Sequence, residues 1–140
     1  MTDVHRDPTE DSSGCVAEPV RTILRLEHAI VLAVLVYLYW QHGASWILFA
    51  VFLLAPDLLM AGYLRNTRLG AILYNTSHSY IGPLLLGAFS LYRPELVPAA
   101  IIWAAHIAFD RALGYGLKYA DSFQHTHLGM IGRAHRGTRN

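Results

Sequence analysis

Long, uninterrupted apolar segments dominate the chain between its two polar ends. Four such segments span residues 22–41, 46–64, 69–92 and 97–118. Each is close to the ~20 residues that an α-helix needs to cross the hydrocarbon core of a bilayer. None of them alternates polar and apolar residues, so membrane-crossing strands are not expected. The pattern predicts an all-α fold, an integral membrane bundle of four transmembrane helices.

The polar segments define the connections and the tails. The predicted spans are separated by short polar stretches at residues 42–45, 65–68 and 93–95. Residues 1–20 are polar and acidic, which predicts a disordered tail. Residues 120–140 predict a cytoplasmic tail, the first part of which we expect to fold back under the bundle as a lid. One transmembrane domain, residues 21–119, is therefore expected between the two tails.

Composition supports this assignment and excludes several other classes. The chain is 54% hydrophobic and only 15% charged, whereas a soluble domain carries about a quarter charged residues. Cys15 is the only cysteine, so neither an internal disulfide nor zinc-finger spacing exists. No basic stripe with interleaved aromatic residues supports nucleic-acid binding, and residues 114–116 are too short a glycine motif for a nucleotide loop. No cleavable signal peptide is expected, so the first span would direct insertion.

The distribution of basic residues predicts the orientation. Nine of the eleven lysines and arginines lie on the cytoplasmic side if both termini are cytoplasmic, which leaves Arg93 outside and Arg111 within the last span. Short cytoplasmic loops of membrane proteins are enriched in lysine and arginine. We therefore expect a multi-pass protein of the inner (cytoplasmic) membrane, with the N- and C-terminus both inside.

Polar residues within the spans carry the functional hypothesis. Ionisable groups are costly in hydrocarbon and usually face the interior of a bundle. They occur in all four spans: Glu27 in the first, Asp57 in the second, Tyr74, Asn75 and His78 in the third, and His106, Asp110 and Arg111 in the fourth. The carboxylates and His78 lie roughly 8–14 Å from the cytoplasmic boundary, and His106 lies near ~18 Å. Four helices would thus present polar groups at nearly one level.

Local spacing sharpens this prediction. His106 and Asp110 are four residues apart and share one helix face, as do Tyr74 and His78. Pro56 lacks a backbone donor and should bend the second helix beside Asp57. The tail directly after the last span adds further histidines, of which His127 is the preferred candidate.

Histidine and carboxylate side chains together favour a divalent metal ion, either zinc, iron or manganese. The predicted ligands are Glu27, Asp57, His78, His106, Asp110 and His127, with Tyr74, Asn75 and Arg111 in supporting roles. Three carboxylates and one arginine lie inside the predicted bundle. The two remaining carboxylates must be protonated, pair with imidazolium or bind a cation.

Simpler interpretations of the outer candidates stay open. Glu27 lies near Arg25 and near the boundary, where its carboxylate could reach the aqueous interface. Asp57 could instead neutralise Arg111 as a buried ion pair. His127 lies in a polar tail, where a solvated histidine is the ordinary case.

The inner candidates also have alternatives. Asp110 could hold His106 in place through a hydrogen bond without touching a metal. Tyr74 and Asn75 could serve mainly as hydrogen-bonding groups between helices.

Several motifs resemble the bacterial family described as domain of unknown function 4260. The motifs are RLE at 25–27, LAPDL at 54–58, GYL at 62–64, YNTSH at 74–78, HIAFDRALGYGLKY at 106–119 and THLG at 126–129. The resemblance covers residues 23–132, and the long motif at 106–119 is the most specific. The sequence departs from the family at His28, where a glycine usually follows the glutamate. The resemblance implies a small multi-span bacterial membrane protein and no established activity.

Two function classes follow from these residues. The first is a membrane-embedded, metal-dependent enzyme that acts on a lipid-like or lipophilic substrate from the cytoplasmic leaflet, as a hydrolase or a di-metal oxidase. No serine or cysteine nucleophile with a partner base is visible, which disfavours covalent acyl transfer. The second class is non-enzymatic, with the same groups forming a proton or ion path or the core of an assembly subunit. The lipid bilayer is the expected partner, and the sequence leaves a homo-oligomer open.

Overall fold

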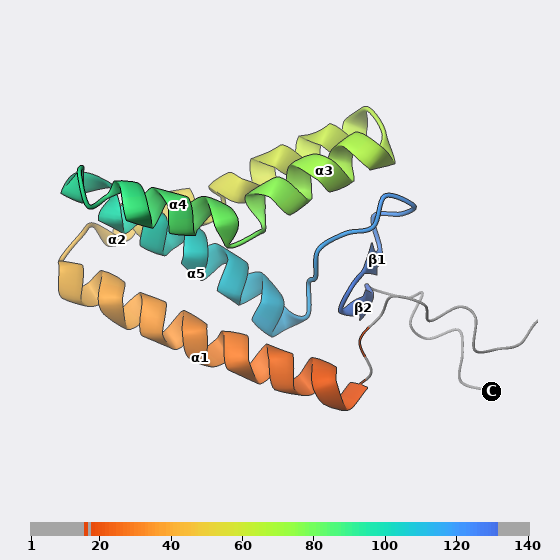
Figure 1. Ribbon diagram of the computed structural model, residues 1–140, viewed down its shortest axis with the longest axis horizontal. Coiled ribbons are helices and arrows are strands. Elements are labelled where there is room, and N and C mark those ends of the chain that lie inside the picture. Colours follow the sequence, from red (N-terminus) through yellow and green to blue (C-terminus); the bar gives the residue numbers. More distant parts are fainter. Residues whose placement is uncertain (1–15, 17, 132–140) are drawn as a thin grey trace, which may run out of the picture.

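The computed structural model describes residue 16 and residues 18–131 (Figure 1). Its elements are α1 (Glu18–His42), α2 (Trp46–Leu53), the 3-10 helix η2 (Ala55–Leu64), α3 (Thr67–Ser77), α4 (Ile81–Phe89), the 3-10 turn η3 (Pro94–Leu96), α5 (Val97–Leu113), β1 (His125–Thr126) and β2 (Gly129–Met130). The predicted acidic tail lies mostly outside the described residues. Its last residues, from Glu18 onward, begin α1 rather than belonging to a tail.

Helix α5 is the centre of the molecule. Helix α1 packs along its length, and α2 and α4 contact it as well (Figure 1). Helix α3 packs against η2, so these two form a second antiparallel pair. The apolar core is supplied largely by α5, through Ile102, Ala105, Ile107 and Ala108. The protein is thus helical, with a two-stranded hairpin of β1 and β2 as the sheet in its described part.

Three helical segments are long and apolar enough to cross a membrane: Glu18–His42, Trp46–Leu64 and Pro94–Leu113. Their outward faces are strongly apolar. Ile47 is 77% exposed and Leu58 is 75% exposed. Contiguous exposed apolar surface on this scale is typical of a lipid-facing surface rather than of a monomer in water. Length and composition therefore indicate a membrane-embedded protein.

The predicted third span, residues 69–92, is not one continuous helix. The structure divides it into α3 and α4, which follow each other along the long axis of the molecule (Figure 1). Helix α3 begins at a capping residue, Asn66, whose side chain accepts a hydrogen bond from the Leu69 amide at 2.8 Å, and it ends at His78. Pro83 explains the division, because it has no amide to donate and tolerates only the first turn of a new helix. Each half is shorter than a membrane crossing.

The α-helix of the second span is interrupted next to Pro56, where a bend was predicted. Helix α2 stops at Leu53, and the chain continues as a 3-10 helix with Pro56 in its first turn. The Asp57 amide donates to the Leu54 carbonyl, three residues back, at 3.2 Å. A 3-10 stretch longer than three or four residues is uncommon inside a helical element and often marks a functional position.

The fourth span ends before its predicted boundary at Lys118. Helix α5 stops at Leu113, and Gly114 follows with a φ of 98° in the left-handed region. Glycine adopts this conformation without steric cost and commonly terminates helices. The rest of the described chain, residues 114–131, runs across one end of the bundle and forms the β1–β2 hairpin (Figure 1).

The connections gather at two ends of the molecule. The start of α1, the loop between η2 and α3, and the hairpin lie toward one end, and the α1–α2 and α4–α5 connections lie toward the other (Figure 1). The first end is the one that the basic residues assign to the cytoplasm. Arg133, Arg136 and Arg139, which contribute to that assignment, lie outside the described residues.

Candidate metal centre

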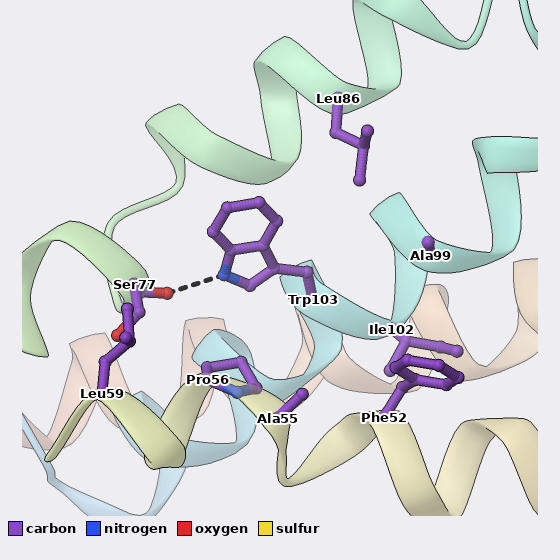
Figure 2. A pocket seen from close by; sticks show the side chains of 9 residues that line it. All are labelled: Phe52, Ala55, Pro56, Leu59, Ser77, Leu86, Ala99, Ile102 and Trp103. Carbon is purple, nitrogen blue, oxygen red and sulfur yellow. Dashed lines mark hydrogen bonds between the residues drawn. The ribbon is translucent and has the colours of Figure 1, made fainter. Parts of the chain in front are cut away.

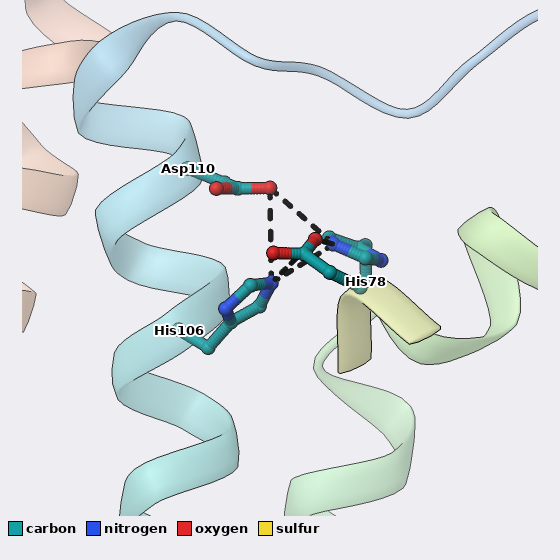
Figure 3. A group of neighbouring side chains, drawn as sticks. His78, His106 and Asp110 are labelled. Atoms are coloured by element: carbon teal, nitrogen blue, oxygen red, sulfur yellow. Dashed lines mark hydrogen bonds and ion pairs between the residues drawn. The ribbon is translucent and has the colours of Figure 1, made fainter. Parts of the chain in front are cut away.

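Four side chains of types that can bind a metal ion converge where α3, η2 and α5 meet. His78 comes from the end of α3, and His106 and Asp110 come from one face of α5 (Figure 3). Asp57 comes from η2. Each offers one nitrogen or oxygen atom, and the four atoms lie within 4.8 Å of one another. We call this group the His–Asp tetrad. The two breaks described above, at Pro56 and after α3, bring Asp57 and His78 to α5.

The distances within the tetrad are those of a compact coordination site. The two Nε2 atoms of His78 and His106 are 2.9 Å apart. From the His78 Nε2 atom, Asp57 Oδ1 lies at 3.3 Å and Asp110 Oδ2 at 3.4 Å. From the His106 Nε2 atom, the same oxygens lie at 3.5 and 3.9 Å. Ligand atoms around a tetrahedral zinc ion with bonds of about 2.0 Å are separated by about 3.3 Å, so a group of this size could hold a single ion.

The backbone fixes the tautomer of His78. Its Nδ1 atom lies 2.9 Å from the Tyr74 carbonyl oxygen. Because a carbonyl only accepts, Nδ1 carries the proton and Nε2 keeps its lone pair. The Nε2 atom is the one that points into the tetrad. A protonated nitrogen held by a carbonyl opposite the ligating nitrogen is the usual arrangement of a metal-binding histidine.

Tyr74 and Ser77 complete the support of the tetrad. The Tyr74 hydroxyl donates to Asp110 Oδ2 at 3.2 Å, and its ring stacks on the His78 imidazole with 3.8 Å between centroids. The Ser77 hydroxyl donates to the Tyr74 carbonyl at 3.0 Å and lies 2.8 Å from His78 Nδ1. These contacts orient one histidine and one carboxylate before any ligand arrives.

Charge and exposure distinguish the four members. Among the described residues, neither carboxylate forms an ion pair with a lysine or an arginine. The side chains of His78 and His106 are 0% and 3% exposed, Asp110 is 14% exposed, and Asp57 is 40% exposed. With neutral imidazoles the tetrad carries two negative charges, which one divalent cation balances. The Asp57 edge is open.

Arg111 does not neutralise Asp57. Its guanidinium donates instead to two backbone carbonyls, those of His78 at 2.9 Å and Tyr115 at 2.7 Å. The first bond holds the end of α3 against α5. Arg111 thus supports the tetrad by fixing the backbone of one of its members.

Asn75 anchors the chain after α5. Its side-chain amide donates to the Lys118 carbonyl at 2.8 Å and accepts from the Lys118 amide at 2.7 Å. Asn75 thus links α3 to the segment 114–131, and its predicted role in supporting a metal site stays a prediction.

The structure does not bring two of the predicted ligands to the tetrad. Glu27 is exposed on α1 and is not among the four residues of the group. His127 lies in the segment 114–131, where its Nδ1 atom accepts a hydrogen bond from the Leu117 amide at 2.9 Å. Burial, with a further contribution from the Arg111 charge, lowers the pKa of His127. His127 thus holds the backbone of the segment 114–131 in place through its bond with the Leu117 amide.

Sequence reasoning assigned no role to Ser77 or Lys118. Ser77 could have been noticed as the neighbour of His78. The Lys118 ammonium group lies 3.0 Å from the ring centroid of Phe123 and 4.6 Å from that of Tyr74. Burial lowers the pKa of Lys118 to about 8. Its position next to Tyr74 depends on the fold after α5, for which the sequence carries no clear signal.

A comparison with protein families identifies the chain. The family model described as domain of unknown function (DUF4260) matches residues 21–131. The chain belongs to this family. No curated protein and no solved structure matches it. The DUF4260 match covers every residue of the tetrad and the whole segment after α5.

Proposed function

We propose that this DUF4260 protein is a membrane-embedded, metal-dependent enzyme that acts on a lipophilic substrate from the cytoplasmic leaflet. The observation that carries the proposal is the convergence of two imidazole nitrogens and two carboxylate oxygens, in which neither carboxylate forms an ion pair with a lysine or arginine of the described residues. Such a group is costly in a protein interior unless a cation is present. The tetrad is exposed on its Asp57 side, and a substrate would reach the bound ion from there.

The donor set supports one ion and hydrolysis. Two histidines and two carboxylates within 4.8 Å suit a single zinc-type ion, whereas di-iron bundle sites use about four carboxylates and two histidines. A divalent ion bound to three protein groups lowers the pKa of its bound water to about 7 and so supplies a nucleophile at neutral pH. Hydrolysis is therefore favoured over di-metal oxidation.

The residues of the tetrad would have different roles in the reaction. His78, His106 and Asp110 are the more buried members and would hold the ion, with Tyr74 orienting Asp110. Asp57 would accept the proton of the attacking water, because it is the exposed member and lies 3.3–3.5 Å from both histidines. The partly open Asp57 edge is where a scissile bond would approach.

The topology of the proposed enzyme has both termini in the cytoplasm. An even number of crossings requires α3 and α4 to cross together as one interrupted span. Interrupted backbone is tolerated at membrane depth where it is buried in protein or lines a cavity. The break after His78 lies beside α5, which supports this assignment. Reporter fusions at the two ends test it, and activity of a periplasm-only reporter at either end would contradict it.

Elemental analysis of the purified protein tests the metal. We expect near-stoichiometric zinc, iron or manganese in the native protein. His106→Ala and Asp110→Ala should each lose it, while His42→Ala, at the far end of α1, should retain it. A native protein that is metal-free and does not bind added divalent ions would refute the enzyme proposal.

Asp57 is tested separately with cobalt(II) as the bound ion. We expect Asp57→Asn to bind cobalt in the same amount as the native protein. The pH at which the visible spectrum changes should move upward, because the proton acceptor of the bound water is gone. Loss of cobalt from this variant would make Asp57 a ligand instead of a base.

The alternative is a non-enzymatic proton path. His106 Nε2 and Asp57 Oδ1 lie 2.9 and 3.3 Å from the same atom, His78 Nε2, so a proton taken up at this atom could be passed between them, and the interrupted third span resembles the broken helices of transporters. Metal-free protein whose reconstituted vesicles carry protons, with loss of transport in His78→Ala, would favour this alternative.

A further inference from the structure

An apolar cavity of about 260 Å³ is lined in part by Pro56 and Ser77, the residues that directly precede Asp57 and His78 of the His–Asp tetrad (Figure 2). It is bounded by Phe52, Pro56, Leu86, Ala99, Ile102 and Trp103, among others. Three connections tie it to the tetrad. Pro56 directly precedes Asp57, Ser77 both lines the cavity and contacts His78, and Trp103 lies one helical turn before His106.

The walls of the cavity are held in place. The Trp103 indole N–H donates to the Ser77 carbonyl at 2.7 Å (Figure 2). Gly82 packs against the same indole, and a side chain at that position would collide with the ring. The indole is therefore fixed between α4 and the end of α3. A wall built in this way defines a site rather than a packing defect.

The side chains that line the cavity leave no free hydrogen-bonding group for a water molecule or a charged ligand. The Trp103 N–H is already bonded to Ser77, and the Ser77 hydroxyl donates to the Tyr74 carbonyl. The other walls are hydrocarbon, with Pro56 and Ile102 buried at the base. A buried water needs two to four polar partners, so this space favours an apolar occupant.

The position of the cavity identifies the source of that occupant. Its walls come largely from two segments that are long and apolar enough to span a membrane, Trp46–Leu64 and Pro94–Leu113. Its rim includes Phe52 and Leu59, which are 52% and 41% exposed. These residues would face hydrocarbon in a bilayer, so a lipid chain can enter from the side without crossing water.

We propose that this cavity binds one hydrocarbon chain of a membrane lipid, with the polar end of that lipid at the Asp57 edge of the tetrad. The distance along α5 supports this arrangement. Ala99 lies seven residues before His106, which corresponds to about 10 Å of helix. The chain would extend from the tetrad toward the middle of the bilayer, as lipid tails do. That the lipid is a substrate rests on the proposed enzymatic function, whereas chain binding itself does not.

Quenching of Trp103 fluorescence by 9,10-dibromostearic acid tests the proposal. In a Trp40→Phe/Trp46→Phe background Trp103 is the only indole left of three. The protein is placed in bilayers of unbrominated phosphatidylcholine, and the brominated acid is added in small steps. A bound chain gives saturable quenching, which unbrominated stearic acid reverses by competition. Random collision in the bilayer gives quenching that rises linearly and does not saturate.

Two alanine variants separate the cavity from general bilayer effects. Ala99→Phe fills the far end of the cavity and should lose the saturable component. Ala88→Phe adds the same bulk on the exposed side of α4, outside the cavity lining, and should retain it. Linear quenching in the native background, or equal saturable quenching in both variants, would overturn the proposal.

Metal content distinguishes this proposal from the function proposed above. Ala99→Phe should keep the native metal content and lose chain binding. His106→Ala should lose metal and keep saturable quenching. A protein that binds the chain without metal refutes the enzyme alone, and one that binds metal without saturable quenching refutes the cavity alone.

Discussion

Helix α1 and the α3–α4 segment differ in continuity: α1 is one uninterrupted helix, whereas the α3–α4 segment is divided into two short helices. Helix α1 is one continuous 25-residue helix in which Tyr39 is the one buried residue. Helices α3 and α4 have 11 and 9 residues, and they meet beside the tetrad. Both regions carry an ionisable residue within an apolar sequence, Glu27 in α1 and His78 at the end of α3. Only His78 reaches the tetrad.

The difference shows that a polar residue in a membrane segment needs local geometry to become part of a site. Continuous α1 keeps its side chains on a regular helical surface, and the Glu27 face is turned outward. At the end of α3 the chain leaves the helix, so the His78 backbone receives a bond from Arg111 and its ring stacks on Tyr74. An interruption thus allows several groups to approach one histidine.

The largest expected effect is on metal affinity, and it distinguishes the tetrad residue Asp110 from Glu27 in α1. Asp110→Asn should weaken metal binding by more than about 100-fold, beyond the roughly 10–100-fold expected when only a supporting partner is lost. Glu27→Gln removes a carboxylate at a similar predicted depth and should leave binding unchanged. Competition with a chromophoric chelator measures both affinities. Equal losses in the two variants would make α1 part of the site.

The second effect concerns the support of the tetrad from α3. Tyr74→Phe removes the hydroxyl that donates to Asp110 and keeps the ring that stacks on His78. We expect metal affinity to fall by about 10-fold or more, with little change in helix content. Tyr37→Phe is the matched control in α1, because Tyr37 is 52% exposed. If Tyr74→Phe left the metal affinity unchanged, the Tyr74 hydroxyl would not be needed to orient the Asp110 carboxylate.

The third effect concerns packing of α3 against η2. A methyl group at Gly70 would collide with the ring of Tyr63, whereas one at Gly87 in α4 would meet nothing within 4 Å. Gly70→Ala should therefore destabilise the protein by about 1–3 kcal/mol, the usual cost of overpacking. Gly87→Ala should be neutral or slightly stabilising, since alanine favours the helix. Thermal unfolding in detergent micelles compares the two variants.

The smallest effect is a pH dependence beyond the end of α5. Burial lowers the pKa of Lys118 from 10.5 to about 8, so between these values the unfolded chain binds more protons than the folded one. Stability therefore rises with pH over this window as the buried amine loses its proton. The melting temperature of the native protein relative to Lys118→Met should increase between about pH 8 and 10.5. A constant difference across this range would contradict a buried, titrating amine.

Several features of the site were accessible from the sequence because they depend on local rules. Pro56 predicted a local disturbance of the second helix, a bend, since proline removes a backbone donor wherever it stands, and the structure changes from α to 3-10 helix there. The i, i+4 spacing of His106 and Asp110 predicted a shared face of α5, which the structure confirms. Counting residues from the predicted span ends placed Asp57, His78 and Asp110 at similar distances from the cytoplasmic boundary. The ligand role of the tetrad stays a prediction.

Other features needed the tertiary structure. Depth along a helix does not give the direction of a side chain around the helix axis, and for that reason Glu27 could not be separated from Asp57. The break between α3 and α4 coincides with Pro83, whose effect on the helix the prediction of one continuous third span overlooked. The early end of α5 depends on Gly114 adopting a positive φ, which the predicted run to Lys118 overlooked.

The sequence by itself thus determined the helical class and three of the four apolar segments, whereas the depth of the polar groups in the membrane stays a prediction. These follow from local composition and from the rise of 1.5 Å per helical residue. The tertiary structure alone decided which polar groups meet, that Arg111 serves backbone carbonyls instead of Asp57, and that an apolar cavity lies beside the tetrad. These depend on contacts between residues far apart in the chain, whose mutual rotation no local pattern encodes.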